Sequence, residues 1–262
     1  MNKPHKARKR FGQNFLQDSN IIHQIIMAIS PLENDHLVEI GPGQGAITDP
    51  LLASKCQLDV VELDRDLVEK LSYQFADASN FTLHSADALE FDFSTLNTGK
   101  KLRIVGNLPY NISTPIMFHL LEQASNIQDM HFMLQKEVVN RLQAQPGSKR
   151  FGRLSIMVQL HCDVEALFDV DPECFTPRPA VMSSIVRLTP HKTKKYQVNN
   201  QALFEKIVTL AFSQRRKTIR NSLKNHCTDA QFEGANIDPR LRAEALSIED
   251  FVRLVNLIGD SE

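Results

Sequence analysis

The chain has 262 residues, of which 42% are hydrophobic and 23% charged, and its formal net charge is −1. This is an ordinary globular composition with enough apolar material for a core. The four widely spaced cysteines form no Cys-x-x-Cys pair, which argues against a disulfide framework or a zinc site and fits a reducing cytoplasm. No apolar stretch approaches the roughly 20 residues that span a bilayer, and the basic N-terminus lacks the apolar segment of a secretory signal.

Helix-like and strand-like segments alternate through the first two thirds of the chain. The first is a helix over 20–29, where isoleucines recur at helical spacing and Ser19 can serve as the cap. Short apolar runs then predict five strands, at 36–40, 58–63, 81–84, 102–106 and 130–135. Helices are predicted after Gly45 and over 65–75, 112–124 and 136–144. This alternation predicts a Rossmann-like α/β domain, with a parallel sheet and helices on both faces.

Two further strands, 164–170 and 183–188, are expected at an antiparallel edge of the sheet. The polar, basic stretch at about 190–200 reads as a linker. Beyond it only helical periodicity occurs, and Ser247 and Asp250 are spaced as a capping box. We therefore expect two domains, residues 1–190 with a basic N-terminal extension and a small all-helical domain over residues 191–262.

Residues 38–45, VEIGPGQG, read as a strand that turns into a helix through three glycines. Glycines let a backbone approach a ligand closely, and the start of a helix offers unpaired N–H groups. Such a turn can serve a dinucleotide, or it can be a tight turn without any ligand. Glu39, just before the glycines, suits the cationic end of S-adenosylmethionine better than the pyrophosphate of NAD.

Acidic residues follow the next two predicted strands. Glu62 ends the second strand about twenty residues past Gly41, a position from which a carboxylate can bind ribose hydroxyls. Asp87 follows the third strand and could accept a hydrogen bond from an adenine amine, with Ala88 and Leu89 against the ring. Either acid alone could be a surface or capping residue. Because ligands collect at the carboxyl ends of parallel strands, the combination predicts a nucleoside cofactor.

Residues 107–110, NLPY, directly follow the fourth predicted strand. Adenine N6 is a poor nucleophile because its lone pair is delocalised, and acceptors on its two N–H bonds would hold it pyramidal. Asn107 offers a side-chain oxygen, and Pro109 restricts Leu108 so that the Leu108 carbonyl has a fixed direction. Tyr110 can stack on an extruded base. The pattern favours methyl transfer to adenine N6, although a plain β-turn could use the same residues.

Seven segments, in order along essentially the whole chain, resemble the ribosomal RNA adenine N6-dimethyltransferase family, and above all its bacterial small-subunit type. They are GQNFL (12–16), EIGPGQGAIT (39–48), VELD (61–64), SADAL (85–89), NLPYNIST (107–114), FTPRPAVMSSIVRL (175–188) and FSQRRKTIRNSL (212–223).

The resemblance implies that S-adenosylmethionine methylates N6 of two adjacent adenosines near the 3′ end of small-subunit rRNA. It implies roles for residues at each matching position. The cofactor would be bound by Asn14, Leu16, Gly41, Glu62, Asp87, Ala88 and Asn107. The catalytic loop would be Asn107, Leu108, Pro109 and Tyr110. Phe175 would be the second aromatic wall for the target base, although most phenylalanines are simply packed in a core.

Two basic regions suggest a polyanionic partner. Residues 1–10 carry five lysines and arginines and no acid, and residues 191–226 carry nine against Glu205 alone. Such runs can also be solvated surface. The spacing of four between Arg216, Arg220 and Lys224 predicts one helix face. The candidate RNA-binding residues are Arg215, Arg216, Lys217, Arg220 and Lys224.

The sequence thus predicts a cytoplasmic, monomeric rRNA dimethyltransferase that acts on a pre-30S-type particle and uses no metal. Three alternatives remain open. They are a large-subunit rRNA methyltransferase of the macrolide-resistance type, a non-catalytic ribosome assembly factor with a vestigial cofactor site, and a nicotinamide oxidoreductase.

Overall fold

The computed structural model describes residues 13–96, 98–109 and 112–259. The basic extension and Tyr110 lie outside the described residues. The chain divides into two compact units. The first ends at Val139 and resumes over Val164–Pro190, and the second combines Asn140–Asp163 with the chain from His191 onward. The predicted boundary after residue 190 coincides with a unit boundary, whereas residues 140–163 pack with the second unit and not with the first.

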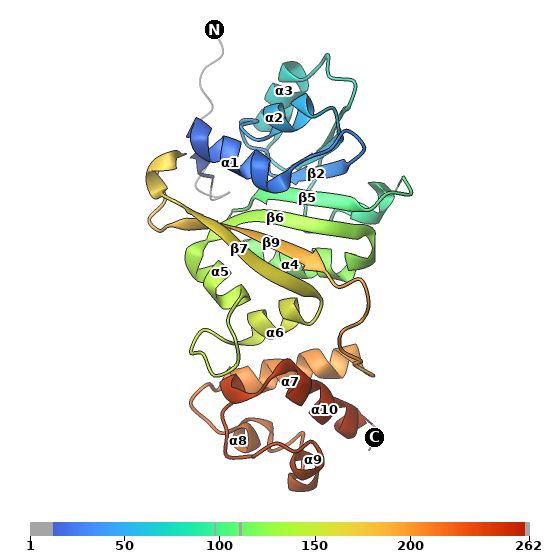
Figure 1. Ribbon diagram of the computed structural model, residues 1–262, viewed down its shortest axis with the longest axis vertical. Helices are drawn as coiled ribbons and strands as arrows, with labels where there is room; N and C mark the ends of the chain where they lie inside the picture. Colours follow the sequence, from blue (N-terminus) through green and yellow to red (C-terminus); the bar gives the residue numbers. More distant parts are fainter. Residues whose placement is uncertain (1–12, 97, 110–111, 260–262) are drawn as a thin grey trace. The chain divides into compact units, whose positions relative to one another are not determined.

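A seven-stranded sheet carries the strands in the order β4-β3-β2-β5-β6-β9-β7 (Figure 1). Strands β2 to β6 pair in parallel, and β9 pairs with β6 in antiparallel orientation, as predicted for the edge. The strands are β2 (His36–Ile40), β3 (Gln57–Glu62), β4 (Phe81–Ser85), β5 (Leu102–Asn107), β6 (Ile127–Gln135), β7 (Cys162–Val170) and β9 (Ser183–Pro190). Each predicted strand is present within a few residues of its expected bounds.

The order of the strands creates a crevice between β2 and β5. From β2 the chain builds outward through β3 to β4, then returns to the other side of β2 as β5. The connections on the two sides therefore diverge at the carboxyl ends of β2 and β5. An open α/β sheet binds its ligands at such a reversal.

Five helices connect these strands or precede them: α1 (Ser19–Ile29), α2 (Thr48–Ala53), α3 (Arg65–Gln74), α4 (Ser113–Glu122) and α5 (Lys136–Leu142). The cap of α1 is Asp18, which accepts hydrogen bonds from the N–H groups of Asn20 and Ile21, so the prediction of Ser19 was wrong by one residue. Pro115 lies in the first turn of α4, where no N–H is needed.

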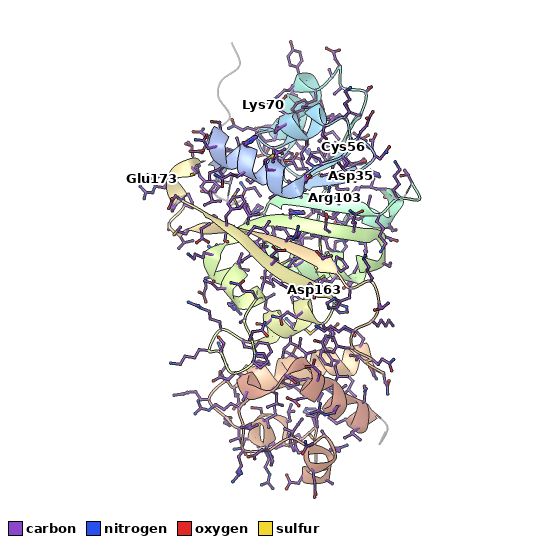
Figure 2. The ribbon with its side chains drawn as sticks, viewed as in Figure 1. Asp35, Cys56, Lys70, Arg103, Asp163 and Glu173 are labelled. Atoms are coloured by element: carbon purple, nitrogen blue, oxygen red, sulfur yellow. The ribbon has the colours of Figure 1, made fainter. Side chains whose placement is uncertain are left out.

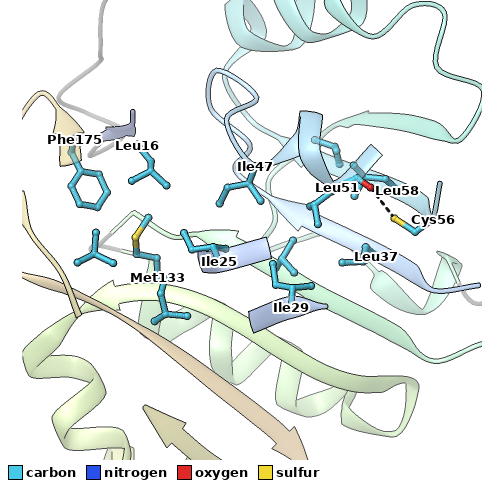
Figure 3. Packing of buried hydrophobic residues seen from close by; sticks show 14 residues of the cluster. Leu16, Ile25, Ile29, Leu37, Ile47, Leu51, Cys56, Leu58, Met133 and Phe175 are labelled. Carbon is cyan, nitrogen blue, oxygen red and sulfur yellow. Dashed lines mark hydrogen bonds between the residues drawn. The ribbon is translucent and has the colours of Figure 1, made fainter. Parts of the chain in front are cut away.

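A two-stranded sheet joins distant parts of the first unit. Strand β1 (Phe15–Leu16) pairs with β8 (Phe175–Thr176) in antiparallel register. Figure 3 shows Leu16 and Phe175 side by side, near Met133 and beside Ile25 of α1. These residues belong to a buried cluster that also includes Ile29 of α1, Leu37 of strand β2 and Leu58 of strand β3. The N-terminal segment is thus fixed by apolar packing as well as by backbone pairing.

The second unit is helical apart from the start of β7. Its helices are α6 (Arg153–Gln159), α7 (Gln201–Ser213), α8 (Ile219–Leu223), α9 (Asp229–Gly234) and α10 (Ile248–Gly259). Short 3-10 helices occur in both units. The first unit contains η2 (Phe93–Leu96), η3 (Ala124–Asn126) and η4 (Pro172–Cys174), and the second contains η5 (Ala243–Ala245). The capping box of α10 is present, since Ser247 and Asp250 bind each other's backbone N–H groups. In the described part of the chain, every helix falls short of the length and hydropathy that crossing a membrane requires.

A buried ion-pair network holds the amino end of β5. The guanidinium of Arg103 lies 2.6 Å from Asp35 and 3.0 Å from Asp129, and donates a further hydrogen bond to the carbonyl of Ile29 (Figure 2). It therefore joins the end of α1, the approach to β2 and strand β6 to the strand that ends at Asn107. Its side chain is only 9% exposed, so the carboxylates depend on it for their charge balance.

We expect Arg103→Ala to lower the free energy of unfolding by about 3–5 kcal/mol, because it leaves two largely buried carboxylates unpaired. Urea unfolding at pH 7 measures the change. The matched control is Arg187→Ala, which removes an exposed pair with Glu165 and should cost less than about 1 kcal/mol. Equal losses in the two variants would contradict this assignment.

Candidate functional site

A pocket of about 340 Å³ opens at the carboxyl ends of β2 and β5 in the first unit. Ten of the predicted site residues line it: Asn14, Leu16, Gly41, Glu62, Asp87, Ala88, Asn107, Leu108, Pro109 and Phe175. They come from six separate segments of the chain, which the fold brings together. Tyr110, the remaining predicted member of the catalytic loop, lies outside the described residues.

The glycine turn after β2 forms the floor of this pocket. Gly41 has a φ of +66°, which an L side chain rarely adopts, and a Cβ at this position would meet no atom within 4 Å. Its N–H donates to the carbonyl of Val61 on β3. The turn therefore holds bare backbone open to a ligand, as the glycine spacing predicts. Helix α2 begins only at Thr48, three residues later than Gly45.

Two acids occupy the next strand ends. Glu62 is 7% exposed, and its Oε1 accepts a hydrogen bond of 2.8 Å from the Asp64 N–H. Burial raises the pKa of Glu62 above its usual value, although backbone N–H groups of Asp64, Leu63 and Gly43 oppose the rise. Asp87 accepts from the Leu89 N–H through Oδ1, which orients the carboxylate beside Ala88. Both acids can accept hydrogen bonds from a nucleoside.

Glu39 lies deeper, at the end of β2. It is 2% exposed, and Thr48 donates to its Oε2 over 2.6 Å. Burial, together with the nearby Glu62, raises the pKa of Glu39 to about 7 even though the Thr48 hydrogen bond opposes the rise. A cation bound in the pocket would favour the ionised carboxylate.

The charge of the lining distinguishes between the two classes of nucleoside cofactor. Three carboxylates line the pocket, those of Glu39, Glu62 and Asp87, and no lysine, arginine or histidine is among the described lining residues. A pyrophosphate would meet only like charge here. S-adenosylmethionine carries a sulfonium and an ammonium, and its nucleoside would lie by Glu62 and Asp87. The residues present therefore fit S-adenosylmethionine.

The N-terminal segment orients the side chain of Asn107. The Asn107 Nδ2 donates a hydrogen bond of 3.1 Å to the carbonyl of Asn14. Only the NH₂ of an amide can donate to a carbonyl, so this contact decides which way the amide is turned and leaves Oδ1 as its acceptor. Gln13 secures the same segment through a hydrogen bond of 3.1 Å from its Nε2 to Asp64. Sequence reasoning missed Gln13, although it belongs to the GQNFL motif.

Close packing fixes the backbone on both sides of Asn107. A Cβ at Gly106 would lie 2.7 Å from the Ile40 carbonyl oxygen, so only glycine permits this approach of β5 to β2. Leu108 is 1% exposed, and its N–H donates to the carbonyl of Met133 on β6. The Leu108 peptide is therefore held from one side by β6 and from the other by Pro109.

Phe175 lines the pocket but is almost fully buried. It is 5% exposed and belongs to the cluster with Leu16 and Met133. A ring packed in this way has little free face for stacking. Its burial favours a structural role, and the role of a second wall for the target base stays a prediction.

The candidate RNA-binding residues lie in the second unit, and the structure corrects their arrangement. Helix α7 ends at Ser213 and α8 begins at Ile219, so Arg216 lies in the connecting turn and not on one helix face with Arg220 and Lys224. Arg220 pairs with Asp229. Arg215 donates to the carbonyls of Lys149 and Phe151. Whether these residues bind RNA stays a prediction.

No group of three His, Cys, Asp or Glu residues with the geometry of a metal site occurs in the described ranges. The cysteines Cys56, Cys162, Cys174 and Cys227 are unpaired thiols. Besides its three acids, the pocket is lined by the side-chain amides of Gln13, Asn14, Gln17, Gln44 and Asn107.

The parallel sheet, the glycine turn and the acids at successive strand ends define an S-adenosylmethionine-dependent methyltransferase. Comparison with known proteins identifies its family. Residues 4–260 match the family described as ribosomal RNA adenine dimethylase. "Ribosomal RNA small subunit methyltransferase A" of Pseudomonas putida is 56% identical over 259 residues, which cover 98% of this chain and 97% of the relative. The chain belongs to the ribosomal RNA adenine dimethylase family.

Solved structures agree with this assignment. A dimethyladenosine transferase from Plasmodium falciparum superimposes with a TM-score of 0.79 at 24% identity, covering 92% of this chain and 95% of that one. The 23S rRNA methyltransferase ErmE gives 0.72 at 25% identity, covering 94% and 100%. The solved structures confirm the predicted fold class. The family match and the 56% identical relative confirm the enzymatic activity of an rRNA adenine dimethyltransferase, with S-adenosylmethionine as the methyl donor.

We expect Glu39→Gln to stabilise the cofactor-free protein increasingly as the pH rises. A carboxyl whose pKa is raised to about 7 by folding holds a proton that the unfolded chain releases near the usual glutamate pKa of 4.5, so wild-type stability is lost as pH rises between these values. The difference between variant and wild type should shift in favour of the variant by about 2–3 kcal/mol between pH 5 and pH 8. Urea unfolding at both pH values measures it, and a difference independent of pH would refute the raised pKa.

We expect Asn107→Asp to lose activity nearly as fully as Asn107→Ala. Aspartate keeps an acceptor oxygen but cannot donate to the Asn14 carbonyl, so the acceptor is no longer held in place. The expected loss in the rate of methyl transfer is about 10²-fold. Single-turnover kinetics at saturating cofactor measure the rate, with cofactor affinity determined separately by calorimetry. If Asn107→Asp kept the wild-type rate, the hydrogen bond to Asn14 would have no role in catalysis.

Proposed function

We propose that this protein transfers methyl groups from S-adenosylmethionine to N6 of two adjacent adenosines near the 3′ end of small-subunit rRNA. We further propose that it acts as a cytoplasmic monomer on a pre-30S-type particle. The observation that carries the proposal is the oriented amide of Asn107, which lies at the end of β5 beside a pocket lined by carboxylates.

When bound, S-adenosylmethionine supplies an electrophilic methyl group on a positively charged sulfur. In the proposed reaction, Asn107 Oδ1 accepts one N6–H of an extruded adenine, and the carbonyl of Leu108 accepts the other. These two acceptors hold the nitrogen pyramidal and aim its lone pair. Positioning of this kind supplies much of the rate, so no strong base is needed before attack. The nitrogen becomes cationic as the bond forms, and it then loses its proton.

A second transfer to the same nitrogen constrains the site further. After the first transfer only one N–H remains, so the base must turn about its exocyclic bond and place a methyl where a hydrogen was. Leu108, Pro109 and Ile112 line the pocket next to Asn107. Their apolar surfaces suit a methyl group, which supports dimethylation at this site.

The choice of small-subunit rRNA rests on sequence similarity. The Pseudomonas putida relative, whose name specifies the small subunit, is 56% identical, whereas the 23S rRNA methyltransferase ErmE is 25% identical. The difference favours the small-subunit reaction over the large-subunit alternative. The intact pocket, with Glu62, Asp87 and Asn107 all present, argues against a non-catalytic assembly factor. The absence of cations among its described lining residues argues against a nicotinamide dinucleotide.

We expect the purified protein to transfer tritiated methyl groups to small subunits isolated from cells that lack the modification. Digestion and chromatography of the rRNA should yield N6,N6-dimethyladenosine at two adjacent positions. Naked small-subunit rRNA should react more slowly than the particle, and large subunits should not react.

Small subunits that already carry the modification are the matched negative control. Methylation of large subunits at the rate of small subunits would overturn the proposed specificity. Faster reaction of naked rRNA would overturn the proposal that the substrate is a particle.

A further inference from the structure

The second unit carries a basic surface made of two chain segments that are far apart in sequence. One is the turn 213–217 between α7 and α8, and the other is the loop 143–152 between α5 and α6. The exposed cations Arg216 and Lys217 belong to the turn, and exposed Lys149 belongs to the loop. The two segments lie side by side because the side chain of Arg215 binds backbone carbonyls in the loop (Figure 1).

Arg215 uses its guanidinium to hold the loop. Its Nη2 donates to the carbonyls of Lys149 and Phe151 and lies 3.5 Å from the carboxylate of Glu244. The backbone of Glu244 in turn accepts a hydrogen bond of 2.7 Å from Gly147 N–H in the same loop. One guanidinium nitrogen of Arg215, Nη2, thus makes all of these contacts within the protein, which separates Arg215 from its neighbours in the sequence.

The turn itself is anchored at both ends. Phe212, which precedes it, packs its ring against Phe151 and Phe251. Ile219, which follows it, is fully buried and donates to the carbonyl of Leu241 over 2.7 Å. Residues 213–217 line an open hollow of about 580 Å³ between these anchors. The cations at its edge are therefore presented by a backbone that is already in place.

Neither Lys149, Arg216 nor Lys217 has an acidic partner within 4 Å among the described residues. Their neighbours differ from them in this respect, since Arg215 faces Glu244 and Arg220 faces Asp229. Cations without counter-ions on a rigid surface suit the phosphates of a nucleic acid backbone, which position an RNA without reading its bases.

We infer that Lys149 of the α5–α6 loop joins Arg216 and Lys217 in one phosphate-binding surface for rRNA, and that Arg215 is the positioning residue that holds its two parts together. This inference rests on the proposed action on rRNA. It revises the sequence-based expectation, because Lys149 is not among the candidate RNA-binding residues of the sequence and Arg215 changes from a phosphate ligand to a support.

The test measures the affinity of the full-length protein for unmodified small subunits as a function of salt concentration. We expect Lys149→Ala to weaken binding about 3- to 10-fold at 0.1 M salt and to reduce the slope of log K against log salt by about 0.7–0.9, the loss of one phosphate contact. The matched control is Lys206→Ala, which removes the same charge from an exposed position on α7 outside the hollow and should leave the slope unchanged.

Arg215 is tested by charge-conserving replacement. A lysine keeps the charge, but its ammonium lies one bond closer to the backbone than the Nη2 that makes all of the Arg215 contacts, so Arg215→Lys should lose as much affinity as Arg215→Ala. Adding Lys149→Ala to Arg215→Lys should cause little further loss, since the loop is already released. Circular dichroism and urea unfolding verify that the second unit of each variant is folded, because the cofactor pocket belongs to the first unit and does not report on it.

Two outcomes would overturn the inference. If Lys149→Ala kept the wild-type affinity and salt slope, the loop would not belong to the phosphate-binding surface. If Arg215→Lys kept the wild-type affinity, Arg215 would act as an ordinary phosphate ligand and not as a support. Failure of the proposed function looks different, because the wild-type protein would then transfer no methyl groups to the small subunit. In the variants, saturating substrate should restore the wild-type rate, so that KM rises and kcat does not fall.

Discussion

The pairing of β2 with β5 is the constraint on which the site depends. These strands are neighbours in space although β3 and β4 separate them in sequence, so their carboxyl ends bring the glycine turn and Asn107 to one crevice. Gly106 permits the approach, since any side chain there would collide with the Ile40 carbonyl. Arg103 holds the opposite end of β5. The position of a single amide is thus determined by the sheet as a whole.

The charges of the two units match the ligands proposed for them. Carboxylates line the pocket in the first unit, and burial keeps the pKa values of Glu39 and Glu62 raised until a cation arrives. Unpaired cations occupy the turn and loop of the second unit, where a polyanion would bind. The near-zero net charge of the chain conceals this division, and a pI alone would give no indication of either ligand.

Much of the fold and most of the pocket could be predicted, because buried parallel strands read as apolar runs and their ends must meet at one edge. Contacts that depend on the path of irregular segments could not be predicted. The link from Asn107 to Asn14 spans 93 positions, and no periodicity signals it. The prediction that Arg216 shares a helix face with Arg220 and Lys224 is wrong for a related reason, because spacing alone cannot show where α7 ends. Helix α6 (Arg153–Gln159) is absent from the elements that the sequence predicts.

The two-residue strand β1 lines part of the pocket, and this affects how cofactor exchange and methyl transfer follow one another. Two methyl groups on one nitrogen require a spent cofactor to leave and a fresh one to enter. Parting β1 from β8 breaks a few hydrogen bonds, each worth about 1 kcal/mol, and removes Leu16 from the buried cluster, but it leaves the main sheet intact. The same movement withdraws the Asn14 carbonyl that orients Asn107. If Asn107 holds the adenine as proposed, that hold is relaxed at each exchange, which favours a distributive course with the singly methylated base released between rounds.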